Sequence, residues 1–116
     1  MNFKEKEIIK LKLGICLQHI ISANKGKATE NREAGKEDVL LVTSLRKLEA
    51  ASGIDFSTIQ RISVGDKNAE FSTLVALADG LNITPSELIA YYPEITSKEI
   101  SELQKKKEEL RKKKDK

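Results

Sequence analysis

Residues 44–65 restrict the fold most strongly, because they hold two short apolar-patterned segments joined at Gly53. Thr43 or Ser44 can cap the first segment and Asp55 the second, so two short helices are predicted. A sharp turn between packed helices often needs a positive φ, which costs residues other than glycine about 1 kcal/mol or more. The residues spaced to fill the wedge between the helices are Leu48, Ile54, Ile59 and Ile62.

Apolar periodicity, caps and glycines predict helices along most of the remaining chain. The predicted helices cover residues 4–23, 45–51, 56–64, 71–79 and 85–91 or 92, followed by a charged helix that opens at Thr96 and Glu99 and runs toward the C-terminus. Gly26 is the expected stop of the first helix, and residues 27–38 are expected to form an exposed, mobile loop. The apolar run at 39–42 fits either a buried extended segment or a helix start.

The composition fits a small charged protein without a catalytic site. The chain has 116 residues, enough for one domain, and its net charge of +3 permits nucleic-acid binding. Cys16 and His19 are the only residues of their types, and two such ligands do not make a zinc site. We therefore predict no enzyme activity, no metal and no cofactor. No apolar run approaches the roughly 20 residues of a membrane span, so we expect a cytoplasmic protein with no membrane partner.

The second of the two short helices is predicted to expose a stripe suited to reading DNA bases. We fix Ile59 in the core and turn about 100° per residue. The residues that then fall on the outer face are Ser57, Gln60, Arg61 and Val64. An arginine can bridge O6 and N7 of guanine, and a glutamine can bridge N6 and N7 of adenine. The alternative for Arg61 is an ion pair with a surface acid.

Residues 44–88 resemble the Cro/repressor helix-turn-helix family, also called XRE-like. The resemblance rests on an ordered set of short motifs across four helices. These are Gly53, Ser57-Thr58-Ile59, Arg61-Ile62 before Gly65, Asp66-Lys67-Asn68, Phe71-Ser72-Thr73-Leu74, Leu77-Ala78, Gly80-Leu81-Asn82-Ile83 and Pro85-Ser86-Glu87-Leu88. The first helix matches the family more weakly.

The resemblance implies an all-α fold, with a five-helix repressor-like DNA-binding domain over residues 1–93. It also implies an insertion at about 27–42 between helices one and two, and a charged C-terminal helix over 94–116. The third helix would enter the major groove of double-stranded DNA. Base reading is assigned to Phe56, Ser57, Gln60 and Arg61. Phosphate contacts are assigned to Thr43, Ser44, Arg46, Lys67 and Asn68, and the flanking Thr58 hydroxyl is a further DNA-binding group.

The implied function is that of a sequence-specific transcriptional regulator. We expect a repressor that acts as a homodimer by occupying its DNA site. One rival is an antitoxin-like or protein-interaction module, in which the insertion or the C-terminal helix binds a partner protein and DNA binding is secondary. A second rival is a purely structural helical bundle, which would have no salt-sensitive affinity for DNA.

Three departures from the family pattern bear on these expectations. Glu49 stands where the family usually has a small residue packed against the recognition helix. Because a buried unpaired carboxylate is costly, Glu49 must bend outward or find a partner. Leu45 replaces a glutamine that usually reaches phosphate. The insertion adds roughly fifteen residues to a connection that is normally about 2–8 residues long.

Other residues leave alternatives open. Phe56 is either a hydrophobic cap on the recognition helix or a contact to a thymine methyl group. Tyr91 and Tyr92 form either a plug under the bundle or part of a dimer interface. The C-terminal helix is either a solvated face or a short coiled coil through Ile100, Leu103 and Leu110, whose seam Lys107 interrupts.

Overall fold

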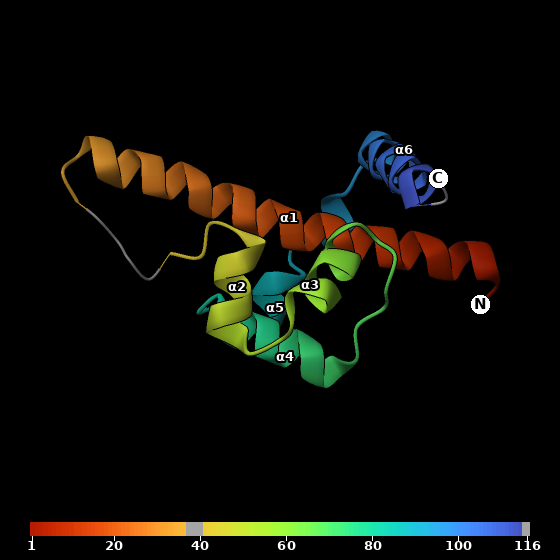
Figure 1. Cartoon of the computed structure of the whole chain (residues 1–116), viewed down its shortest axis with the longest axis horizontal. Helices are drawn as coiled ribbons and strands as arrows, with labels where there is room; N and C mark the ends of the chain where they lie inside the picture. The colour runs from red at the N-terminus through yellow and green to blue at the C-terminus, as the bar shows by residue number, and fades with distance from the viewer. Residues whose placement is uncertain (37–40, 115–116) are drawn as a thin grey trace.

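The computed structural model describes residues 1–36 and 41–114, and its regular structure there is entirely helical (Figure 1). The elements in chain order are α1 (Phe3–Glu33), α2 (Leu45–Ser52), α3 (Phe56–Ser63), α4 (Phe71–Gly80), α5 (Pro85–Leu88), the short 3-10 turn η1 (Tyr92–Glu94) and α6 (Ser97–Lys114). The predicted all-α fold is confirmed. Within the described part of the chain, no helix has both the length and the apolar content needed to cross a membrane.

Helix α1 is longer than predicted. It begins at a capping box between Asn2 and Glu5 and continues through Gly26 to Glu33. The predicted stop at Gly26 is wrong, because one glycine costs a helix only about 1 kcal/mol and good helix-forming residues follow it. The chain instead leaves the helix at Gly35, where φ is +73°.

The predicted loop at 27–38 is therefore helical as far as Glu33, although most of its residues are exposed. Residues 37–40, which include half of the apolar run at 39–42, lie outside the described residues. Leu41 and Val42 are not helical, which removes the helix-start alternative for them. Val42 is buried, and its carbonyl group accepts a hydrogen bond from the Asn24 side chain at 2.9 Å. The chain that returns from the end of α1 is thus attached to α1 before α2 begins.

The main core lies between α1 and the short helices α2 to α5, which pack on one side of it in Figure 1. Its fully buried side chains include Leu17, Leu48, Ile59, Ile62, Leu77 and Leu88. The turn between α2 and α3 has Gly53 at φ +76°, as the sequence predicted. The chain therefore turns directly from α2 into α3, which packs on α1, whereas α2 packs on α3 and α4.

Helix α3 crosses α1 at Gly14, where the two backbones touch. A Cβ atom at this position would lie 2.8 Å from the carbonyl oxygen of Ile62 and 2.7 Å from that of Ser63. The Gln18 side chain, one turn further along α1, donates a hydrogen bond to the same Ser63 carbonyl. The last turn of α3 is thereby held against α1.

Helix α6 packs on the N-terminal half of α1 and is not a free tail. Leu103 is buried with Leu11 and Ile15, and Ile100 and Tyr91 pack against this second cluster. The predicted capping box at its start is present, since Thr96 and Glu99 exchange hydrogen bonds. Ile100 and Leu103, which were candidates for a coiled coil, pack against residues of the same chain. The coiled-coil alternative is therefore wrong for these two residues.

Cys16 and His19 are one turn apart on α1, but their surroundings differ. Cys16 is fully buried, and burial raises the pKa of its thiol to about 11. The His19 ring stacks on the Tyr91 ring with the ring centroids 4.1 Å apart, and the Tyr91 hydroxyl donates to Glu99 at 2.9 Å. Tyr91 therefore joins α1 to the start of α6.

We predict opposite effects from alanine at two glycines of α1. Gly14→Ala should lower the free energy of unfolding by about 1–3 kcal/mol, because its methyl group would push α3 off α1. Gly26→Ala should raise the free energy of unfolding by about 0.5–1 kcal/mol, because its Cβ meets no atom within 4 Å and alanine favours a helix. Urea denaturation followed by circular dichroism measures both. No stabilisation by Gly26→Ala would show that α1 ends earlier.

Candidate nucleic-acid interface

The N-terminus of α3 is held by Asp55. Its carboxylate accepts hydrogen bonds from the Thr58 backbone N–H at 3.1 Å and from the Thr58 hydroxyl at 2.8 Å. Both bonds lower the pKa of the Asp55 carboxyl group, and the bond from the Thr58 hydroxyl has the larger effect. The Thr58 hydroxyl is therefore engaged in capping the helix, beside the outward stripe rather than on it.

The outer face of α3 carries the polar stripe that the helical spacing predicted. Ser57, Gln60 and Arg61 are exposed, whereas Ile59 and Ile62 are fully buried. The buried pair fixes the rotation of the helix about its axis. Because successive residues are about 100° apart, the three polar side chains are held away from the core.

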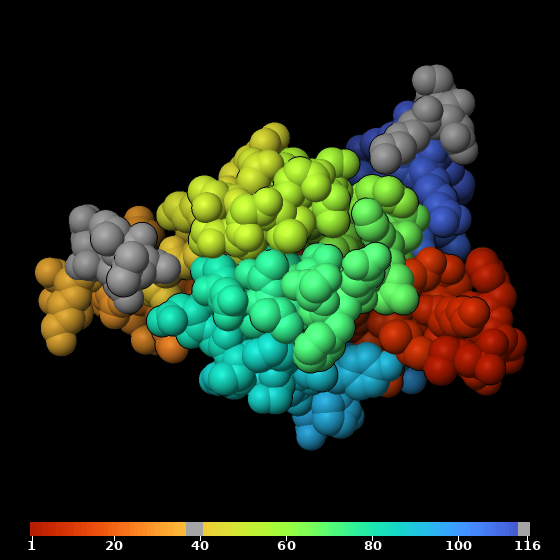
Figure 2. Space-filling view, turned by 90° about the horizontal axis from the view of Figure 1, so that it is seen from below, coloured from red at the N-terminus to blue at the C-terminus, as the bar shows by residue number. Residues whose placement is uncertain are grey.

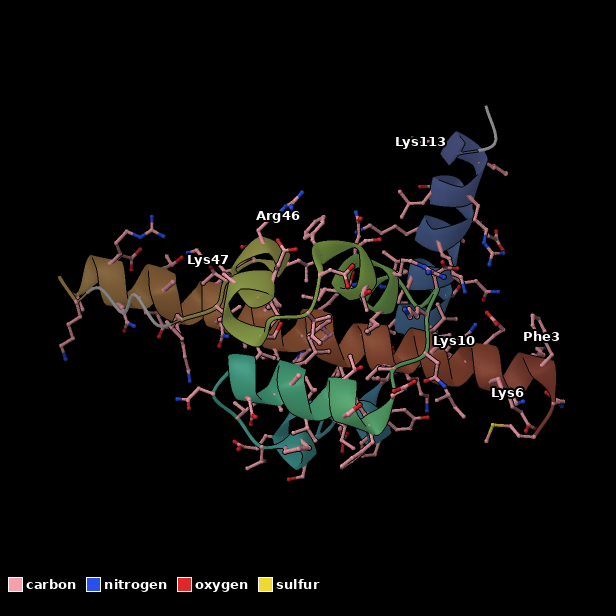
Figure 3. All side chains as sticks on the ribbon, turned by 60° about the horizontal axis from the view of Figure 1, so that its bottom comes forward. Phe3, Lys6, Lys10, Arg46, Lys47 and Lys113 are labelled. Atoms are coloured by element: carbon pink, nitrogen blue, oxygen red, sulfur yellow. The ribbon has the colours of Figure 1, made fainter. Side chains whose placement is uncertain are left out.

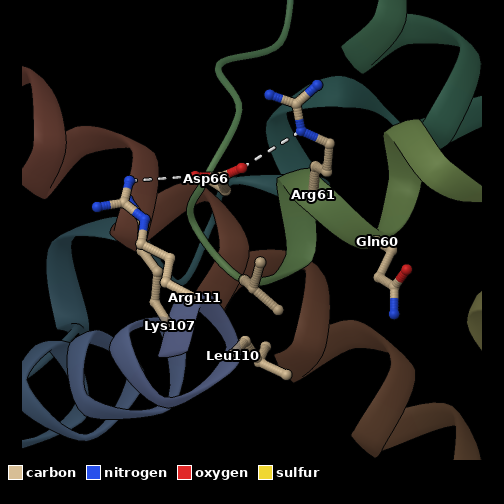
Figure 4. Close-up of a pocket in the computed structure, with 7 residues that line it drawn as sticks. Gln60, Arg61, Asp66, Lys107, Leu110 and Arg111 are labelled. Carbon is tan, nitrogen blue, oxygen red and sulfur yellow. Dashed lines mark hydrogen bonds and ion pairs between the residues drawn. The ribbon is translucent and has the colours of Figure 1, made fainter. Parts of the chain in front are cut away.

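Arg61 pairs with a surface acid and still presents donors outward. Its Nε atom donates to Asp66 Oδ2 at 3.3 Å, and the side chain remains 50% exposed. Figure 4 shows the two terminal nitrogens of Arg61 on the side of the guanidinium away from Asp66. These terminal donors are the ones that a bidentate contact to guanine can use, so the ion pair orients Arg61 without occupying its fork.

Asp66 lies between two arginines. Its other oxygen, Oδ1, is 3.4 Å from Nη2 of Arg111 on α6 (Figure 4). Burial by itself would raise the pKa of Asp66, but the hydrogen bonds from Arg61 and Arg111 outweigh it and the pKa is lowered. The carboxylate therefore stays charged at neutral pH and links the end of α3 to α6.

Glu49 is accommodated by a partner and by partial exposure. Its Oε2 atom accepts a 2.7 Å hydrogen bond from the Phe56 backbone N–H, one of the unpaired amides at the start of α3. The side chain is 39% exposed, and its other oxygen lies 3.7 Å from Arg46. Glu49 thus serves as a second cap for α3, provided by α2.

Phe56 is covered by Arg46. The Arg46 guanidinium lies 3.7 Å from the centroid of the Phe56 ring, which is a cation–π arrangement. The two residues are therefore stacked on each other across the turn between α2 and α3. This arrangement favours the hydrophobic-cap alternative for Phe56 and places the positive charge of Arg46 directly over the start of α3.

The start of α2 adds a cation that the sequence reasoning did not single out. Ser44 caps α2 by accepting from the Lys47 backbone N–H at 3.1 Å, and the Lys47 ammonium group donates to the Thr43 hydroxyl at 3.1 Å. Lys47 is exposed, and Figure 3 shows it on α2 close to Arg46. Leu45 packs against the core, so Lys47, two residues further along, is a candidate for the phosphate contact that the family's glutamine usually makes.

The structure brings most of the predicted residues onto one face. The face combines the α3 stripe with the start of α2, which lie together along one edge of the molecule in Figure 2. Lys67 and Asn68 follow α3 in the loop before α4, and Asn68 is exposed. Lys106, Leu110 and Arg111 of α6 also line grooves beside Gln60. Sequence reasoning did not place these three beside α3, because no local pattern links α6 to α3.

Comparison with known families assigns residues 43–88 to a helix-turn-helix family model. This match agrees with the resemblance to the Cro/repressor, XRE-like helix-turn-helix family that the motifs predicted. The matched segment begins at Thr43, two residues before α2, and ends at Leu88, the last residue of α5. Comparisons with curated proteins and with solved structures found no match.

We predict that removing the Glu49 carboxylate loosens the turn between α2 and α3. Glu49→Ala should lower the free energy of unfolding by about 0.5–2 kcal/mol, the usual effect of losing a helix cap. Glu49→Gln keeps an acceptor for the Phe56 amide and should retain most of the stability. The matched control is Glu70→Ala, because Glu70 precedes α4 without making a capping bond. Equal effects of Glu49→Ala and Glu70→Ala would contradict the role of Glu49 as a cap.

Proposed function

We propose that this protein is a sequence-specific transcriptional repressor that places α3 in the major groove of double-stranded DNA. The observation that carries the proposal is the exposed stripe of Ser57, Gln60 and Arg61, held outward by two fully buried isoleucines. These side chains supply the donors and acceptors that base edges in the major groove require. Helix α3 has eight residues, which suits a short segment of groove.

Phosphate contacts would come from both sides of this stripe. The start of α2 offers Ser44, Arg46 and Lys47, and the loop after α3 offers Lys67 and Asn68. Such contacts set register and orientation on the duplex without reading sequence. They also release counterions, so the affinity should fall steeply as salt rises.

A homodimer is the assembly that best suits DNA recognition by α3. One short recognition helix reads only a few base pairs, whereas two related by a two-fold axis read two half-sites about one helical turn apart. Occupancy of such a site would block transcription from the DNA that it covers. This activity requires access to the chromosome, so we propose a cytoplasmic location.

Selection of bound sequences from a random DNA pool tests the function. We expect a symmetric motif with two half-sites. A sequence-independent pool, together with capture of a partner protein by the surfaces outside the helix-turn-helix, would favour the antitoxin-like alternative instead. An absence of salt-sensitive DNA binding would leave only the structural bundle.

We predict that two substitutions on α3 change sequence preference. Arg61→Ala should lower the affinity for the selected site by about 1–3 kcal/mol, and it should broaden the motif at one position in each half-site. Gln60→Ala should act in the same way at a neighbouring position, but more weakly. Binding to selected and scrambled duplexes, compared at one salt concentration, measures both effects.

The control for these variants is Ile59→Ala, which should destabilise the domain by about 2–5 kcal/mol as a buried large-to-small change. Both α3 variants should instead retain the wild-type unfolding transition. If neither variant changes the ratio of specific to non-specific affinity, α3 is not the element that reads DNA.

A further inference from the structure

Helix α6 is anchored at the end of α3 by a buried lysine. The Lys107 side chain is 8% exposed, and its ammonium group donates to the Gly65 carbonyl oxygen at 2.8 Å and to Glu7 Oε2 at 3.0 Å. A buried ammonium group is costly unless it is paired, so these two bonds hold the helix at one place. Leu103, one turn earlier, is buried against Leu11 and Ile15.

This anchor directs the C-terminal half of α6 toward the DNA-reading side of the molecule. Figures 2 and 3 both show the end of α6 rising beside α3 on the side where α2 and α3 lie. In Figure 3, Lys113 near the end of α6 and Arg46 on α2 lie on opposite sides of α3. α3 therefore lies between two cationic elements.

The groove between α3 and α6 is lined by cations on the α6 side. Lys107, Leu110 and Arg111 face Gln60, Arg61 and Val64 across it, and Lys106 lines an adjoining groove with Gln60. The first groove has a volume of about 190 Å³ and the adjoining one a volume of about 510 Å³. Asp66 also lines the first groove, where it pairs with Arg61 and Arg111, and the cations that surround it suit a backbone phosphate.

Two cations of these grooves, Lys106 and Arg111, are free to exchange their present surroundings for a phosphate. Arg111 is 65% exposed and its 3.4 Å contact to Asp66 is a surface ion pair, which contributes little to stability. Lys106 is also exposed. A phosphate can therefore take either side chain without dismantling the packing between α6 and α1.

The arrangement of charge on α6 indicates attraction to DNA rather than a cover for α3. Around the helix from Lys107, the groove side runs from Lys106 at about −100° to Arg111 at about +40°. Glu108 at about +100° and Glu109 at about −160° both lie outside this range. An element that covers a DNA-reading helix in the absence of DNA would be expected to place acids against Arg61. Here the groove-lining residues contributed by α6 are Lys106, Lys107, Leu110 and Arg111.

We propose that α6 is a second, rigidly docked part of the DNA-binding surface, in which Lys106 and Arg111 bind backbone phosphates beside the C-terminal end of α3 and Lys107 positions them. The inference rests on the proposed function. It adds a phosphate contact outside residues 43–88, and it predicts a protected DNA segment that extends beyond the bases read by α3. Lys107 itself is a positioning residue, because its ammonium group is buried.

The test compares two double variants of α6 that remove the same charge. Lys106→Gln with Arg111→Gln neutralises the groove side. The matched control is Lys105→Gln with Lys112→Gln, whose exposed side chains lie about 160° and 140° around the helix from Lys107. Affinity for a labelled duplex from the selected pool, and for one of scrambled sequence, is measured over a range of salt concentrations.

We expect the groove-side variant to reduce the slope of log affinity against log salt by about 1.8, which is about 0.9 for each phosphate contact. The reduction should be the same on both duplexes, and the control should change the slope much less. If the wild type binds both duplexes and the two variants behave alike, the proposed phosphate contacts of α6 are wrong, while the proposed function stands. Tighter binding by the groove-side variant would show that α6 covers α3, and it would also overturn the proposed phosphate contacts of α6. No binding by the wild type would overturn the proposed function itself.

A third variant tests the anchor. Glu7→Gln makes the protein more positive, which by net charge alone should strengthen DNA binding. We expect weaker binding and a smaller salt slope instead, because Lys107 loses its ionic partner and α6 is no longer held beside α3. Tighter binding with an unchanged footprint would overturn the positioning role of Lys107.

Discussion

The contact between α1 and α3 at Gly14 sets the direction of every side chain on α3. Carbonyl groups of the last turn of α3 occupy the space where a Cβ would stand on α1. Ile59 and Ile62 then turn inward, and Gln60 and Arg61 turn outward. A rotation of α3 by one residue, about 100°, would bury polar groups and expose the isoleucines. The functional face therefore depends on one close approach of two backbones.

The same end of α3 also receives α6. Gly65 lies just beyond the last turn of α3, and its carbonyl group accepts from Lys107. A cation is favourable there because the C-terminus of a helix carries a partial negative charge. Asp66 next in the chain joins Arg61 to Arg111. Two residues at the end of α3 thus couple the helix-turn-helix to a helix that lies outside the family match.

Where the chain departs from the family pattern, nearby residues make up for the change. Glu49, which would be costly as an unpaired buried acid, caps α3 through the Phe56 amide and remains partly exposed. Arg46 stacks on Phe56 and so is held at the start of α3. Lys47 lies two residues after the core residue Leu45, at which the family's glutamine is lost, and brings a cation close to that position. The proposed DNA-binding face therefore keeps its cations and its exposed polar stripe although individual positions have changed.

Sequence alone determined the features that depend on neighbours in the chain. The caps at Ser44 and Thr84 and the positive φ of Gly53 follow from local geometry, as does the outward stripe of α3. The end of α1 was misplaced because the cost of one glycine is small beside the stability of a continuous helix.

Only the tertiary structure decided the partners of charged groups. Lys107 reads as an interruption of an apolar seam, yet it pairs with Glu7, which lies 100 residues earlier, and with the end of α3. Arg61 and Arg111 share Asp66 for the same reason. Long side chains choose their partners from whatever the packing brings within reach, and no helical period encodes that choice. The position of α6 beside α3 therefore comes from packing, whereas the helix-turn-helix comes from local sequence.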